Sequence, residues 1–145
     1  MSQEETGFEL HPQLVKDCVE VIDLPLDRVL LMNDANYPWL VLVPRRPGLR
    51  ELYELGEADL ATFWRESALV GRRMMAHFGG LKFNVAALGN QVPQLHVHHV
   101  VRSAEDAAWP RPIWGVVPMK PYAADALAAR VAQIRALLQE TVREG

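Results

Sequence analysis

Gln94-Leu95-His96-Val97-His98-His99-Val100-Val101 is a stretch in which polar and apolar residues largely alternate. Successive side chains of a β-strand point to opposite faces, so Gln94, His96 and His98 are expected to share one face. The neighbouring leucine and valines share the other face, which we expect to pack on the core. Imidazole exchanges protons near neutral pH and is also a nucleophile, so two imidazoles beside a carboxamide predict a chemical site.

The flanking sequence predicts an α+β fold with an antiparallel sheet. β-Branched and aliphatic runs predict strands over residues 19–24, 28–32, 39–43, 82–88 and 95–101. A helical stripe from Leu60 to Phe78, followed by Gly79-Gly80, predicts one long helix over residues 57–78, before the histidine strand. A short helix over residues 12–18 and a C-terminal helix over residues 123–144 complete the expected elements.

Composition limits the protein class. With 145 residues, half of them hydrophobic, the chain is expected to form a single domain over residues 1–145, with residues 1–7 as a frayed tail. The formal net charge of −3 gives no basic field for nucleic acid. We see no signal peptide or membrane-spanning run and expect a cytoplasmic protein without a membrane partner. Cys18 is the only cysteine, which excludes an intrachain disulfide and a cysteine-based zinc site.

The segment Gly89-Asn90-Gln91-Val92-Pro93-Gln94-Leu95-His96-Val97-His98 resembles the signature of the histidine-triad (HIT) family, in which three histidines alternate with apolar residues after a glycine-containing loop. The run Leu40-Val41-Leu42-Val43-Pro44-Arg45-Arg46 is similar to the family's strand that ends in proline and two basic residues. Strand order and the single long helix also agree, so the resemblance covers roughly residues 20–102.

This resemblance implies a HIT-like antiparallel sheet, usually a homodimer, and a nucleotidyl hydrolase or transferase without a cofactor. The substrate would be a small nucleotide, attacked at its α-phosphorus by the middle histidine. The implied roles are His96 as nucleophile, His98 as a phosphate contact near the leaving group, Gln94 in place of the first histidine, Asn90, Gly89 and Asn84 as phosphate contacts, and Asn33 and Asp34 as ribose contacts.

Two positions depart from the family pattern. Gln94 can form hydrogen bonds but cannot titrate, so we expect it to position a phosphate oxygen. The family's transferase branch carries glutamine at the third histidine instead, so that branch is not supported. His99 lies on the expected core face, where we predict a structural residue without partners, whose replacement by valine holds or raises stability.

Three further interpretations remain open at this point. The chain could be a nucleotide-binding protein without activity. A His-x-His pair can also bind a metal, although no third ligand has a diagnostic spacing, and we expect no metal requirement. Trp109 and Trp114, after the histidine strand, are expected to pack in the interior, with base stacking as the alternative.

Overall fold

The computed structural model describes residues 7–144 and the side chains of residues 7–139, so residues 1–6 of the expected tail lie outside it. A five-stranded antiparallel sheet has the strand order β1-β2-β3-β5-β4. The elements are α1 (Pro12–Asp17), β1 (Cys18–Asp23), β2 (Asp27–Met32), β3 (Trp39–Pro44), a 3-10 turn (Leu52–Glu54), α2 (Glu57–Phe78), β4 (Lys82–Ala86), β5 (Val97–Arg102) and α3 (Ala124–Glu144). The predicted α+β class is confirmed, and no described helix is both long and apolar enough to span a membrane.

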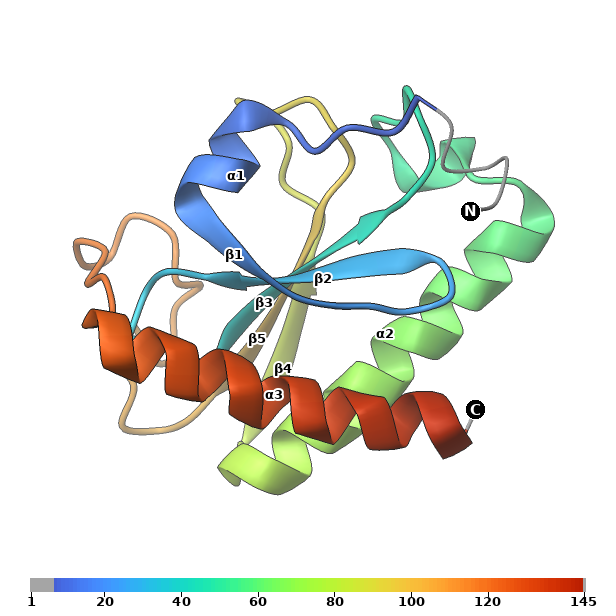
Figure 1. The fold of residues 1–145 in the computed structure, drawn as a ribbon. Helices are drawn as coiled ribbons and strands as arrows, with labels where there is room; N and C mark the ends of the chain where they lie inside the picture. The colour runs from blue at the N-terminus through green and yellow to red at the C-terminus, as the bar shows by residue number, and fades with distance from the viewer. Residues whose placement is uncertain (1–6, 145) are drawn as a thin grey trace.

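Both faces of the sheet are covered (Figure 1). Helices α2 and α3 contact each other, and they pack on one face against β5 and β1. The core beneath them includes Phe63 and Met74 of α2 and Val97 and Val101 of β5. Helix α1 and the segment before α3 cover the other face, where a second core surrounds Val100. The face of β5 that carries Val97 and Val101 packs on the core, as expected, and the face that carries His98 and Val100 is buried as well.

The long helix was predicted with the observed bounds, and Gly79 ends it with φ of 63°, a left-handed conformation that glycine adopts without strain. Glu66, inside this helix, is a buried carboxylate with a structural function. Its oxygens accept the backbone N–H groups of Leu26 and Asp27 at 3.0 and 2.9 Å, which fastens the β1–β2 turn to α2. Burial and the adjoining Glu66 raise the pKa of Asp27 to about 9, so Asp27 is protonated at neutral pH.

Two strands near the histidines are shorter than predicted. Strand β4 ends at Ala86 and β5 begins only at Val97. Between them the chain leaves the sheet, and the Leu95 N–H donates to the Leu49 carbonyl at 2.9 Å instead of to a neighbouring strand. His96 therefore lies on a loop that ends at β5, while His98 lies on the strand itself. Side-chain alternation nevertheless continues through the loop, because Leu95 still packs in the core under α2.

His99 is structural, as expected, but it does not lack partners. Its Nε2 is 2.7 Å from the Ser67 Oγ, and its Nδ1 is 3.0 Å from the Val97 carbonyl. The imidazole is fully buried between Phe63 and Phe83. The expectation that His99 lacks partners is corrected by these contacts, and the prediction for a valine at this position changes with it.

We now predict that His99→Val destabilises the fold by about 1–3 kcal/mol, because it leaves the buried Ser67 hydroxyl without its partner. Ser67→Ala together with His99→Val removes both polar groups and should recover part of that loss. Urea unfolding of the two variants measures the difference. Equal stability of the parent and the single variant would contradict the importance of this hydrogen bond.

Candidate active site

A cavity of about 470 Å³ opens on the sheet face opposite α2, and its lining includes both expected catalytic histidines. Helix α1, strands β2, β3 and β5, the loop before β5 and the segment before α3 all contribute to it. The lining residues are Leu14, Asp17, Met32, Trp39, Leu88, Asn90, Gln91, Val92, His96, His98, Trp114 and Met119. The structure thus brings His96, His98 and Asn90 together, from the set expected by sequence.

His96 has the geometry of a nucleophile. Its Nδ1 is 2.7 Å from the backbone carbonyl of Gln94, which can only accept a hydrogen bond. The proton of a neutral ring is therefore held on Nδ1, and Nε2 keeps its lone pair. The side chain is only 6% exposed, and what remains accessible belongs to the cavity wall. This backbone acceptor belongs to the residue two positions earlier.

His98 is held in the opposite tautomer. The indole N–H of Trp39 donates to its Nδ1 at 3.0 Å, so in the neutral ring the proton is on Nε2. Burial, with a smaller effect of the neighbouring His96 and His99, lowers the pKa of His98 to about 4, against the opposing effect of a hydrogen bond to the Leu88 backbone. His98 is therefore neutral at pH 7. The hydrogen-bond donor of His98 at this pH is the neutral Nε2–H.

We predict that the His98 ring titrates near pH 4, and that it keeps its Nε2–H form down to about pH 5. The ordinary pKa of 6.5 applies to the unfolded chain, so the unfolded state takes up a proton first as pH falls. The stabilising contribution of neutral His98 is complete above about pH 6.5 and is lost as the pH falls towards 4. Nitrogen-15 NMR of the imidazoles measures both the tautomer and the midpoint. A His98 midpoint near 6.5 would contradict this environment.

Gly89, in the loop before β5, lies in a crowded place. A Cβ atom added at Gly89 would lie 3.0 Å from the Val92 carbonyl oxygen and 4.0 Å from Cε1 of His96. Glycine therefore lets the loop backbone pack closely against the Val92 carbonyl and the His96 ring. Asn90, next in the chain, lines the cavity with its side chain exposed. Their roles as phosphate contacts stay a prediction.

The other expected substrate contacts are engaged elsewhere. The Gln94 carboxamide binds the backbone of Glu9 and His11, and it is not part of the cavity lining. Asn84 accepts a hydrogen bond from Arg102 at 2.8 Å.

Asn33 and Asp34 organise a turn. Asn33 accepts the Tyr122 N–H, and Asp34 accepts the N–H groups of Asn36 and Lys120. In this structure Gln94, Asn84, Asn33 and Asp34 are thus groups that support the site without lining it.

Sequence reasoning missed several residues of the cavity. Trp39 sets the tautomer of His98, and Asp17 places a carboxylate at the wall. Trp114, for which base stacking was the alternative to interior packing, is half-exposed and lines the cavity, with its ring centroid 5.1 Å from that of His98 and 6.1 Å from that of Trp39. Trp109 packs instead against the Arg102 guanidinium. The only available signal for Trp39 was its place at the start of a strand that pairs with the histidine strand.

Comparison with known proteins agrees with this geometry. The family model described as "HIT domain" matches residues 13–105. A search of curated proteins gave no significant match. Among solved structures, a histidine triad protein from Marinobacter aquaeolei VT8 is 47% identical, with a TM-score of 0.89 over 92% of this chain and 97% of that one. A histidine triad protein from Bradyrhizobium japonicum is 44% identical, with a TM-score of 0.86 over 90% and 97% of the two chains.

A histidine triad (HIT) protein from Sinorhizobium meliloti 1021 is 37% identical, with a TM-score of 0.87 over 91% of this chain and 98% of that one. Proteins of this family are generally nucleotide-binding hydrolases or transferases. The matched residues include all five strands, helix α2 and both cavity histidines. This chain therefore belongs to the HIT-domain family.

Proposed function

We propose that this protein is a nucleotidyl hydrolase that cleaves a phosphoanhydride or phosphoramidate at the α-phosphorus, through a nucleotidyl-His96 intermediate. The observation that carries the proposal is the 2.7 Å contact between His96 Nδ1 and the Gln94 carbonyl. It fixes the ring with its reactive nitrogen available to the cavity. The chain would be a variant of the family signature in which Gln94 stands at the first histidine position.

The reaction has two displacements. His96 Nε2 forms a bond to the α-phosphorus while the bond to the leaving oxygen or nitrogen breaks, and that atom takes the electron pair. The Gln94 carbonyl stabilises the positive charge that develops on the His96 ring. Water then attacks phosphorus, the bond to Nε2 breaks, and the nucleoside monophosphate is released with a proton passing to solvent.

Neutral His98 assists by hydrogen bonding and does not transfer its proton. Its Nε2–H would leave the Leu88 carbonyl and donate to a phosphate oxygen. A polyphosphate leaving group would depart as an anion, whereas an amine leaving group would obtain its proton from water. The backbone around Gly89 and the Asn90 carboxamide would bind the non-bridging oxygens.

The tryptophan side of the cavity suits an aromatic base. Trp39 and Trp114 present two rings at 88° to each other beside His98, and Trp114 is 37% exposed. Leu14 and Met32 add apolar surface to the same wall. Because stacking on an aromatic ring tolerates any base, this wall supports binding of a nucleoside without selecting one.

Pre-steady-state cleavage of a nucleoside 5′-(4-nitrophenyl phosphate) tests the proposal. We expect a burst of nitrophenolate of about one equivalent per chain, together with a mass increase of one nucleotidyl group on the peptide that contains His96. A protein that binds nucleoside monophosphates without a burst would be the non-catalytic alternative. Activity that is lost with one tightly bound metal ion per chain would establish the metal-binding alternative.

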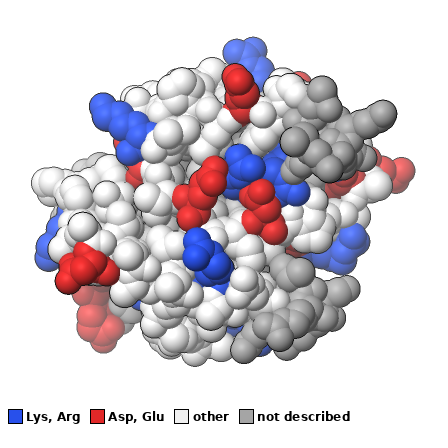
Figure 2. Space-filling model, viewed as in Figure 1, with Lys and Arg blue, Asp and Glu red and all other residues white. Residues whose placement is uncertain are grey.

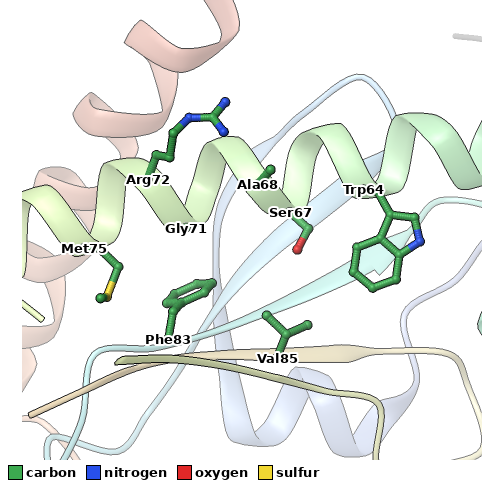
Figure 3. Close-up of a pocket in the computed structure, with 8 residues that line it drawn as sticks. All are labelled: Trp64, Ser67, Ala68, Gly71, Arg72, Met75, Phe83 and Val85. Atoms are coloured by element: carbon green, nitrogen blue, oxygen red, sulfur yellow. The ribbon is translucent and has the colours of Figure 1, made fainter. Parts of the chain in front are cut away.

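We also propose that the protein acts as a homodimer joined along β4 and α2. In the described chain β4 is an edge strand that pairs only with β5, so its other backbone edge is open to a partner. Figure 3 shows Phe83 and Val85 of β4 pointing towards α2, where Trp64, Ala68 and Met75 form the other wall of an apolar groove.

Trp64 and Val85 are 48% and 41% exposed, which is unusual for a monomer surface and is explained by a second copy. By contrast, Figure 2 shows acidic and basic side chains interspersed on the face where α3 lies, without a single-sign field. Sedimentation at micromolar concentration tests the dimer, and Val85→Glu is the variant expected to disrupt it.

A further inference from the structure

Gln94 connects the nucleophile to a segment far away in the sequence. Its Oε1 accepts the His11 N–H at 2.8 Å, and its Nε2 donates to the Glu9 carbonyl at 2.8 Å. The backbone carbonyl of the same residue accepts from His96 Nδ1. One residue therefore holds the nucleophile through its main chain and the N-terminal segment through its side chain.

The carboxamide is well matched to this segment. In an extended chain, the carbonyl of residue 9 and the N–H of residue 11 point to the same side. A carboxamide presents an acceptor and a donor side by side in one plane, so it can bind both groups at once. An imidazole also carries two nitrogens, but they diverge on opposite sides of the ring. The glutamine that replaces the first histidine is thus fitted to a bidentate backbone contact.

The bound segment continues into the wall of the cavity. His11 caps α1, with its Nδ1 accepting from the Gln13 N–H at 3.0 Å and its carbonyl accepting from the Leu14 N–H at 3.0 Å. Leu14 and Asp17 of α1 line the cavity. A shift of His11 would therefore move the side of the cavity that faces the nucleoside.

We propose that Gln94 is a positioning residue that clasps the Glu9–His11 backbone and so places α1 against the nucleotide site, leaving the attack of His96 to its main-chain carbonyl. This inference rests on the proposed nucleotide chemistry. It predicts that the side chain acts on binding and not on the covalent step, because any substituted residue still supplies the carbonyl to His96.

Gln94→Glu is the sharpest test, since it keeps the shape and places a second acceptor against the Glu9 carbonyl. Gln94→Met removes both hydrogen bonds without adding charge. Gln133→Glu, on the exposed face of α3, is the matched control for the charge. Three quantities are measured for the parent and each variant. They are the hydrogen exchange of peptides covering residues 9–17, the Kd for adenosine and guanosine monophosphate, and the single-turnover rate at saturating nitrophenyl ester.

We expect both Gln94 variants to exchange at least about tenfold faster at residue 11 and to bind the monophosphates about tenfold more weakly. The single-turnover rate should stay within about threefold of the parent, and Gln133→Glu should match the parent throughout. Unchanged exchange in both variants would overturn the clasp. Faster exchange with unchanged Kd, or a turnover rate that falls as far as the affinity, would overturn its coupling to the site.

The two proposals fail in different ways. A parent protein that neither binds monophosphates nor forms a burst overturns the nucleotidyl chemistry and the coupling with it. The exchange experiment needs no ligand, so it still decides whether Gln94 holds residues 9–11.

Discussion

His96→Ala is expected to lower turnover by about a thousandfold or more, the scale seen when a covalent nucleophile is removed. The reason is that His98, 5.1 Å away between ring centroids, cannot replace it. The Nε2 of His98 carries the ring proton, and the Nδ1 lone pair of His98 already accepts the indole N–H of Trp39. Nitrophenolate release over several hours measures the residual rate, and the nucleotidyl mass increase should disappear.

Two variants sharpen this measurement. His96→Asn can still donate from its amide to the Gln94 carbonyl but has no nucleophilic nitrogen, so it should be as inactive as His96→Ala while binding monophosphates nearly as well as the parent. His77→Ala, at the exposed end of α2, is the control and should be fully active. Turnover within tenfold of the parent in a folded His96→Ala protein would contradict the nucleophile assignment.

Most of the fold could be predicted from periodicity. The 57–78 helix follows from one apolar stripe and a glycine stop, and the strands follow from runs of aliphatic residues. Two features did not follow. Leu95 looks like a strand residue, but its N–H pairs with Leu49, and this long-range contact leaves no mark on the local pattern. Burial of both sheet faces also could not be read from the polar face of β5, because histidine occurs in cores as well as in sites.

The site was predictable only where the motif itself is local. His96, His98, Asn90 and Gly89 come from one short segment. The structure places the first three around the same cavity and Gly89 beside the His96 ring. Gln94 and Asn33 were expected in the site but bind backbone groups more than 80 residues away in the chain. A polar residue that satisfies a distant backbone group and one that contacts a ligand have the same local sequence signature.

Arg102 and Asp106 form a buried ion pair that sequence reasoning did not identify. The Arg102 side chain is 2% exposed and donates from Nε and Nη2 to the two Asp106 carboxylate oxygens at 2.8 and 3.1 Å. It also donates to Asn84 and to the Arg111 carbonyl. Burial opposes ionisation of Asp106, but hydrogen bonds from Arg102 and from the backbone of Ser103 outweigh it and lower the pKa of Asp106 to about 2.

Arg102→Met is therefore expected to cost about 3–5 kcal/mol of unfolding free energy, because it leaves the Asp106 charge buried without its partner. Adding Asp106→Asn removes the stranded charge and should recover part of the loss. Arg28→Met breaks an ion pair with Asp23 at the surface and should cost less than about 1 kcal/mol. Urea unfolding of the parent, the two single variants and the double variant measures these free energies. The comparison decides whether burial of an ion pair, rather than the number of its ionic contacts, sets the loss of stability.

The consequence of this ion pair extends to the cavity. Arg102 and Asp106 hold the segment from residue 103 to 111, which leads directly to Trp114 at the cavity wall. An Arg102→Met protein that still folds should thus bind nucleoside monophosphates more weakly, while His96, the proposed nucleophile, is unchanged. If Arg102→Met were as stable as Arg28→Met and bound monophosphates like the parent, the pair would contribute to neither the fold nor the aromatic wall.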